Sequence, residues 1–138
     1  MELGKRVLAA QPFSVLVGAE LVQYTDNMVE IQIPITKQLK QQQGFVHGGV
    51  VSYAADNALT FAGGTVFGAD VVTSEFKINY MRPVIGSHLL ARATVMHAGR
   101  NQAVCRCDVF SVAKDGERLC ATAQGTISKL GQASGAKT

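Results

Sequence analysis

The sequence has few cysteines, and their spacing excludes two common ways of stabilising a small domain. It contains three, Cys105, Cys107 and Cys120, without a Cys-x-x-Cys pair or a paired Cys and His spacing. Such a set does not indicate a zinc site. Cys105 and Cys107 stand two positions apart on a predicted strand, which is poor geometry for a disulfide. We therefore expect reduced, buried thiols in a cytoplasmic protein.

Long apolar runs and clustered charges are also missing. No apolar run reaches the length of about eighteen residues that a membrane helix needs, and residues 1–7 lack the apolar segment of a secretory signal. The basic residues are scattered and leave a formal net charge of +3. Nucleic-acid-binding proteins instead carry a basic stripe with interleaved aromatic residues. These absences argue against a membrane or nucleic-acid partner.

The chain does have enough apolar residues for one domain with a core, since 47% of its 138 residues are hydrophobic. The expected core covers about 12–128, with an N-terminal helix or arm over 1–11 and a frayed tail over 131–138. Alternating patterns predict strands over 14–24, 28–34, 71–80, 87–98, 103–112 and 118–129. A loop is predicted over 36–43. A helix is predicted from about 48 to 62, ended by Gly63-Gly64.

The predicted helix carries small residues along one face. These residues fall at helical spacing: Val51, Ala54, Ala55, Ala58 and Ala62. Short turns such as Asp115-Gly116 between consecutive strands indicate an antiparallel sheet. Two strands, one helix and four strands have few ways to pack, and the sheet must curl around the helix to bury its small residues. This predicts an α+β fold whose exposed sheet edges favour a homodimer.

The most informative motif is His47-Gly48-Gly49 with Asp56 nine residues after the histidine. Glycines at a helix start allow a ligand to approach backbone N–H groups, which favour developing negative charge. A carboxylate in an otherwise apolar helix is costly unless it is paired or used. The combination predicts an oxyanion hole and a carboxylate, which together are suited to attack on a carbonyl.

The spacing of His47 and Asp56 has a consequence for the number of chains. Nine residues turn a helix through about 900°, so the two side chains would point to opposite sides. They would also lie about 13 Å apart along the helix axis. They cannot form a dyad within one chain. If both serve one site, two chains must build it.

Two stretches resemble the hotdog-fold acyl-CoA thioesterases of the phenylacetic-acid-pathway (PaaI-like) type: HGGVVSYAADNAL at 47–59 and EFKINYMRP at 75–83. The resemblance covers roughly residues 12–128. It implies an antiparallel sheet wrapped around one long central helix. It also implies hydrolysis of acyl-CoA thioesters without a metal or other cofactor, at a site on a homodimer interface. Whether two dimers join into a tetramer is left open.

The resemblance implies a role for each residue of the motif. Asp56 either attacks the thioester or activates a water, and the sequence does not separate these routes. Gly48 and Gly49 donate backbone N–H groups to the thioester oxygen. His47 holds the loop or touches the ligand.

Further residues follow from the same resemblance. Gln41 stands where the family has an asparagine, and a hydroxyl from Thr73 or Ser74 holds the attacking water. Asn57, Ser74 and Arg82 are expected to bind substrate. The positive net charge suits a phosphate-rich ligand, and three basic side chains are candidates for the phosphates of coenzyme A: Arg82, Arg100 and Lys129.

Other interpretations fit parts of this pattern. A hotdog hydratase would pair a carboxylate with a histidine acting on the same substrate carbon, and only His47 is near. A non-catalytic acyl-CoA-binding sensor would carry a DNA-binding segment or lack the carboxylate. Asp56 also fits a solvated polar stripe with Ser52 and Thr60. The residues that could line an acyl pocket fit a core equally well: Tyr53, Phe61, Phe67, Phe76 and Met81.

Overall fold

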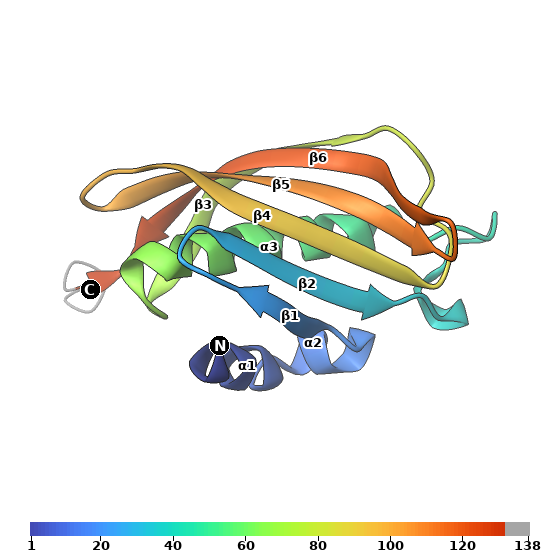
Figure 1. Cartoon of the computed structure of the whole chain (residues 1–138), viewed down its shortest axis with the longest axis horizontal. Coiled ribbons are helices and arrows are strands. Elements are labelled where there is room, and N and C mark those ends of the chain that lie inside the picture. The colour runs from blue at the N-terminus through green and yellow to red at the C-terminus, as the bar shows by residue number, and fades with distance from the viewer. Residues whose placement is uncertain (132–138) are drawn as a thin grey trace.

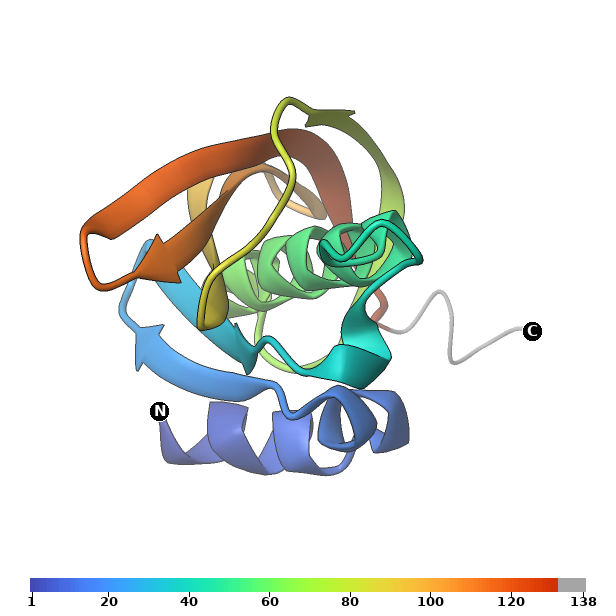
Figure 2. The same ribbon diagram turned by 90° about the vertical axis from the view of Figure 1, so that its right-hand side faces the viewer.

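The computed structural model describes residues 1–131, and the predicted frayed tail lies mostly outside them. Within these residues one long helix, α3, is enclosed by a curved sheet (Figures 1 and 2). The helices are α1 (Glu2–Ala9), α2 (Pro12–Val17) and α3 (Gly48–Phe67), with a short 3₁₀ turn, η1 (Lys37–Leu39). The strands are β1 (Glu20–Tyr24), β2 (Met28–Pro34), β3 (Val71–Tyr80), β4 (His88–Ala98), β5 (Gln102–Ala113) and β6 (Gly116–Lys129).

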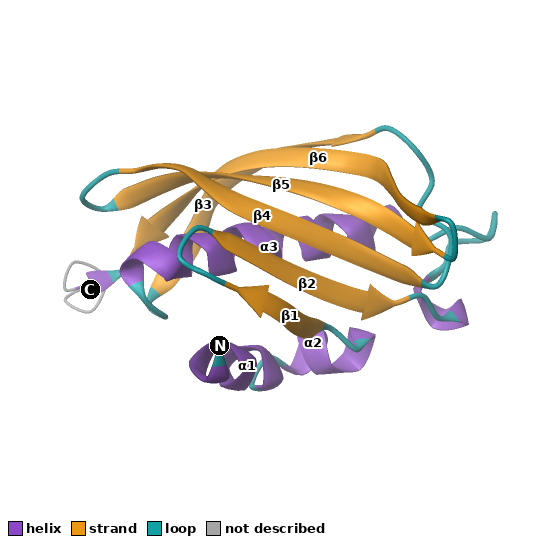
Figure 3. Cartoon of the chain, viewed as in Figure 1, coloured by secondary structure: helices purple, strands orange, loops and turns teal. Residues whose placement is uncertain are grey.

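The strands form one antiparallel sheet in the order β1-β2-β4-β5-β6-β3. Hairpins join β1 to β2, β4 to β5 and β5 to β6, while α3 links β2 to β3 across the concave face (Figure 3). This arrangement confirms the predicted α+β hotdog architecture. No helix in the described residues is both long and apolar enough to cross a membrane.

The small residues of α3 explain how closely the sheet wraps it. Ala54, Ala55, Ala58 and Ala62 have no exposed surface, and Val51 is almost fully buried. Facing them are the inward side chains of the middle strands, including Ile31 on β2, Leu89 on β4 and Val109 on β5. The predicted buried face of the helix is therefore confirmed.

The predicted end of this helix at Gly63-Gly64 is wrong, because the helix continues to Phe67. Gly63 is fully enclosed, and a Cβ added to it would lie 2.7 Å from the Cβ of Ile127 on β6. It allows helix and strand to approach closely rather than ending the helix. The helix is instead followed by Gly68, whose φ of +86° suits glycine.

The predicted strand over 14–24 is also wrong in its first half. Pro12–Val17 form α2, and only Glu20–Tyr24 pair as a strand. Proline suits the first turn of a helix, and Gly18 ends it in the left-handed region at φ +79°. Ser14 and Val17 are buried at helical i, i+3 spacing, while the intervening apolar residues are exposed.

The three cysteines are buried and form no disulfide, as predicted. Burial raises the pKa of the Cys105 thiol to about 11 and raises the pKa of Cys107 for the same reason. Thiols with such values are protonated at neutral pH and act as small core residues rather than nucleophiles.

The two glycines of α3 make a matched pair for measuring this close packing. Gly63→Ala should lower the free energy of unfolding by about 1–3 kcal/mol, because its methyl group overpacks against Ile127. Gly64→Ala meets only the Tyr24 hydroxyl, at 3.8 Å, and should raise the free energy of unfolding by about 0.5–1 kcal/mol through helix propensity. Denaturant unfolding measures both, and equal effects of the two substitutions would contradict this account.

Candidate active site

Asp56 lies midway along α3, half-buried, on the side that faces β3. The Thr73 hydroxyl on β3 donates to its Oδ1 at 2.7 Å, and the Thr60 hydroxyl lies 2.8 Å from that of Thr73. Each hydroxyl has one proton. Thr73 uses its proton on the carboxylate, and the one Thr60 proton is shared between the Thr73 hydroxyl and the Asp56 main-chain carbonyl, which lies 2.9 Å away. Asp56 is thus held at one oxygen, and Oδ2 has no partner within residues 1–131.

A β-bulge decides which of the two predicted hydroxyls reaches Asp56. The pairing of β3 with β6 shifts between Thr73 and Glu75, so Ser74 is the extra residue. Thr73 points inward to the carboxylate. The Ser74 hydroxyl instead bonds to that of Ser128. Ser128 is the neighbour of inward-facing Ile127, so Ser74 lies on the outer face of the sheet.

The start of α3 holds the second group of predicted residues. His47 is the N-cap, and its Nδ1 accepts a hydrogen bond from the Gly49 N–H at 2.8 Å. This bond occupies one of the two predicted oxyanion donors. The N–H of Gly48 has no acceptor within residues 1–131, and Gly48 is exposed. Tyr80, at the end of β3, donates to the Gly48 carbonyl at 3.3 Å.

Gln41 joins this second group. Its loop is attached to the helix start because the His47 N–H donates to the Leu39 carbonyl at 2.8 Å and Lys40 bridges to Val46. The Gln41 side chain is bonded within the loop, where its Oε1 accepts from the Gln43 N–H. The structure therefore separates two half-sites on one helix. Asp56 with Thr60 and Thr73 forms one, and Gly48 with His47 and Gln41 forms the other.

Asn57, predicted to bind substrate, belongs to a different network. Its amide nitrogen lies 3.1 Å from Gln11 Oε1 and 3.1 Å from the Tyr53 hydroxyl. The Ser14 hydroxyl donates to the same Gln11 oxygen at 2.6 Å. These bonds attach the junction of α1 and α2 to the central helix.

The three basic candidates for coenzyme A phosphates occupy two places. Arg82 is exposed and lines a hollow of about 360 Å³ together with Gly48 and Tyr80, beside the helix start. Arg100 and Lys129 line another hollow with His97, at the far ends of β4, β5 and β6. Of the three, Arg82 is the one that lines a hollow together with Gly48.

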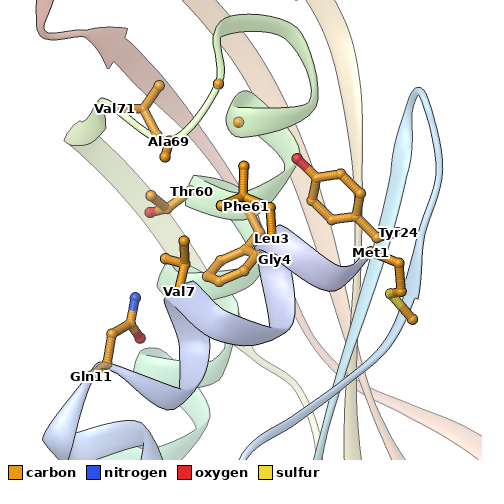
Figure 4. A pocket seen from close by; sticks show the side chains of 12 residues that line it. Met1, Leu3, Gly4, Val7, Gln11, Tyr24, Thr60, Phe61, Ala69 and Val71 are labelled. Carbon is orange, nitrogen blue, oxygen red and sulfur yellow. The ribbon is translucent and has the colours of Figure 1, made fainter.

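Two features of the site were not among the predicted site residues. The sequence indicated Thr60 only as part of a polar stripe with Ser52 and Asp56. Its position four residues after Asp56, on the same face of the helix, was the signal that could have identified it as a neighbour of the carboxylate. An apolar cavity also lies beside Thr60, between α1 and α3 (Figure 4). In residues 1–131, no three side chains of His, Cys, Asp or Glu gather as a metal-binding group.

Comparison with known proteins assigns this arrangement to a class. The family model of the thioesterase superfamily matches residues 43–120, more than half of the chain and both half-sites except Gln41. The chain belongs to the thioesterase superfamily. The predicted class of enzyme, a thioester hydrolase, is thereby confirmed.

Solved structures agree with this assignment. A thioesterase family protein of Silicibacter pomeroyi is 31% identical, with a TM-score of 0.85 over 89% of this chain and 92% of that one. A thioesterase of Haemophilus influenzae is 26% identical, with a TM-score of 0.77 over 90% of this chain and 85% of that one. The Escherichia coli PaaI protein, at 20% identity over 91% of this chain and 89% of its own, shares the fold with a TM-score of 0.81. The predicted resemblance is confirmed.

The bulge provides a matched pair of variants at adjacent positions. Thr73→Val should lower the rate of thioester hydrolysis about ten- to a hundredfold, because it removes a hydrogen bond to a carboxylate worth about 1.5–3 kcal/mol. Ser74→Ala, on the outer face, should change the rate by less than about twofold. Steady-state kinetics with one thioester measures both. Equal losses from the two substitutions would show that Thr73 does not act through Asp56.

Proposed function

We propose that this protein hydrolyses acyl-CoA thioesters, with Asp56 as the reacting carboxylate and the Gly48 N–H as oxyanion donor. The observation that carries the proposal is the state of Asp56, which is held at Oδ1 by Thr73 while Oδ2 lacks a partner among the described residues. The other support is the exposed Gly48 N–H at a helix start, where the unpaired donors favour negative charge.

The reaction consumes one water and releases a carboxylic acid and coenzyme A. In one route Asp56 attacks the carbonyl carbon, the thiolate leaves, and water then cleaves the mixed anhydride. In the other route Asp56 takes a proton from water as its oxygen attacks the carbonyl, and the thiolate leaves from the tetrahedral intermediate. Both routes place negative charge on the thioester oxygen. Both therefore need the Gly48 N–H within hydrogen-bond distance of that oxygen.

The two half-sites meet if two copies of the chain join along β3. This strand has ten residues and forms one end of the sheet, so its outer edge has no partner within residues 1–131. Such an edge favours pairing with another strand. The Thr73 end of β3 adjoins Asp56, and the Tyr80 end adjoins Gly48. Antiparallel pairing of two copies about an axis near Phe76 brings the Tyr80 end of one strand beside the Thr73 end of its partner.

This pairing makes the site shared between protomers. Asp56 of one protomer would face Gly48 of the other. This arrangement is needed because the helix start and Asp56 of a single chain are too far apart to serve one site. Arg82, which lines the hollow beside Gly48, would then lie near the same site and is the favoured candidate for the phosphates of coenzyme A. The homodimer is thus part of the proposed mechanism.

Asp56→Asn tests the role of the carboxylate with little change in shape. The asparagine oxygen can still accept from Thr73, so the fold should be kept. Loss of the reacting carboxylate should lower turnover about a hundred- to ten-thousandfold. Thiol release from butyryl-, octanoyl-, palmitoyl- and phenylacetyl-CoA measures turnover, and size-exclusion chromatography checks the assembly. Near-native turnover in an intact assembly would rule out the role of Asp56. Tight binding of one thioester by the unaltered protein without hydrolysis would instead indicate a sensor.

Gly48→Pro tests the oxyanion donor, because proline lacks the N–H. Gly48 is the first residue of α3, where proline is well tolerated, and His47 at ψ 137° has the extended conformation that a following proline requires. The matched control is Gly48→Ala, which keeps the N–H and places a Cβ at 3.7 Å from the Tyr80 ring. The proline variant should lose about 2.7–4 kcal/mol of transition-state stabilisation relative to the alanine variant.

The same two variants test the shared site. When Asp56→Asn and Gly48→Pro chains are co-refolded in equal amounts, half of the dimers are heterodimers, and each keeps one of its two sites intact. Activity should therefore return to about a quarter of the unaltered value. The separate variants, refolded in the same way, are the controls. Absence of recovery despite heterodimer formation would mean that each chain builds its own site.

A further inference from the structure

An apolar cavity of about 310 Å³ lies between α1 and the C-terminal half of α3 (Figure 4). Its walls come from four segments that are distant in the sequence. These are α1, the end of β1, the last turns of α3 and the link from α3 to β3. Val7 of α1 and Phe61 of α3 both line it, and Tyr24 lies on the opposite side of the view from Gln11 in Figure 4.

The cavity begins one helical turn from Asp56. Asp56, Thr60 and Gly64 recur every four residues and so share one face of α3. Thr60 and Gly64 both line the cavity. Thr60 also contacts Thr73, the residue that holds the Asp56 carboxylate. The four residues from Asp56 to Thr60 rise about 6 Å along the helix axis, so a group joined to a carbonyl at Asp56 would enter the cavity directly.

We propose that this cavity receives the acyl group of the thioester and that Gly64 and Tyr24 set the upper limit of its length. This inference rests on the proposed hydrolysis, because it places the scissile carbonyl at Asp56. The acyl chain would run along α3 from Thr60 past Gly64, beneath α1, and stop near the Tyr24 ring.

Two glycines keep the cavity open and fix the position of α1, which covers it. Gly64 carries no side chain into the space, and a Cβ added there would meet only the Tyr24 hydroxyl, at 3.8 Å. Gly4 of α1 is buried, and a Cβ added to it would lie 2.7 Å from Cδ2 of Leu21 on β1. Gly4 thus allows α1 to pack tightly against β1. Because α1 covers the cavity, it cannot move away from α3 without breaking this contact.

Two of the three polar side chains of the lining, Gln11 and Thr60, lie at the end near Asp56. Gln11 lies on the same side of the view as Thr60 in Figure 4, and its Oε1 accepts hydrogen bonds from Ser14 and Asn57. With the oxygen held in this way, the amide nitrogen is directed toward the cavity (Figure 4). The opposite end is formed by apolar residues and by Tyr24, whose hydroxyl is the polar side-chain group there. This distribution of polar and apolar side chains suits a thioester group at the end near Asp56 and a hydrocarbon chain deeper in the cavity.

The size and lining of the cavity define the substrate class. Its volume is near the lower end of the range for ligand pockets, about 300–1,000 Å³. Its lining side chains are uncharged, so a second carboxylate on the acyl group would have no charged side chain to pair with there. We therefore infer uncharged acyl groups of medium length or with a single aromatic ring, and not long-chain or dicarboxylic acyl groups.

The experiment replaces Gly64 by residues whose side chains would occupy the cavity. In Gly64→Leu, the ratio of kcat/KM for octanoyl-CoA to that for butyryl-CoA should fall about tenfold or more, the effect of excluding even one methylene from an apolar pocket. Gly64→Ala should lower the ratio by less. Val66→Leu adds the same kind of side chain at a position of α3 that is 42% exposed and outside the cavity, so the ratio should stay unchanged. Thermal unfolding shows whether each variant is folded.

Binding measurements separate failure of this inference from failure of the proposed function. Non-hydrolysable thioether analogues of butyryl-CoA and octanoyl-CoA are titrated into the unaltered protein and into folded Gly64→Leu. Loss of preference for the octanoyl analogue in the variant supports the acyl cavity even if no thioester is hydrolysed. An unchanged preference, in kcat/KM or in affinity, overturns it while leaving hydrolysis at Asp56 intact. Absence of binding to either analogue also overturns it.

Discussion

The close contact between α3 and the concave face of the sheet is the constraint on which the rest of the structure depends. Four alanines without exposed surface and the enclosed Gly63 allow the strands to approach the helix backbone. A larger side chain at these positions would push the sheet outward, because interiors of this density do not absorb extra volume. The helix is therefore held at a fixed distance from the strands on both sides of it.

The fixed position of α3 creates the geometry of the site. β3 runs beside the helix for its whole ten residues, so its two ends contact the helix at two points. Near one end Thr73 bonds to Asp56, and at the other Tyr80 bonds to the Gly48 carbonyl. A single bulge between Thr73 and Glu75 turns the correct hydroxyl inward. One strand thus positions the carboxylate and the exposed N–H, and its free edge is where a second chain would bring them together.

The same use of small residues explains the cavity beside the site. Alanines fill the side of α3 that faces the sheet, whereas Thr60 and Gly64 lie on the side near α1. A glycine on this side leaves space that α1 cannot fill, because Gly4 fixes α1 against β1. The space is apolar because several residues that line it belong to the core or pack against it, including Val7, Phe61 and Val71. The fold therefore places an acyl-sized cavity next to a carboxylate without any added segment.

The sequence by itself determined the order of the six strands and the long helix, the buried face of α3, the hairpin at Asp115-Gly116 and the spacing between the His-Gly-Gly motif and Asp56. These features are local, since hydrophobic periodicity and turn residues are set by neighbours within one element. Only the tertiary structure decided the features that depend on distant residues. Ile127 on β6 is the close neighbour that requires a glycine at position 63 within the helix. The register of β3 against β6 is what selects Thr73 over Ser74. The cavity needs four separate segments, and no pattern within one segment encodes a space between several.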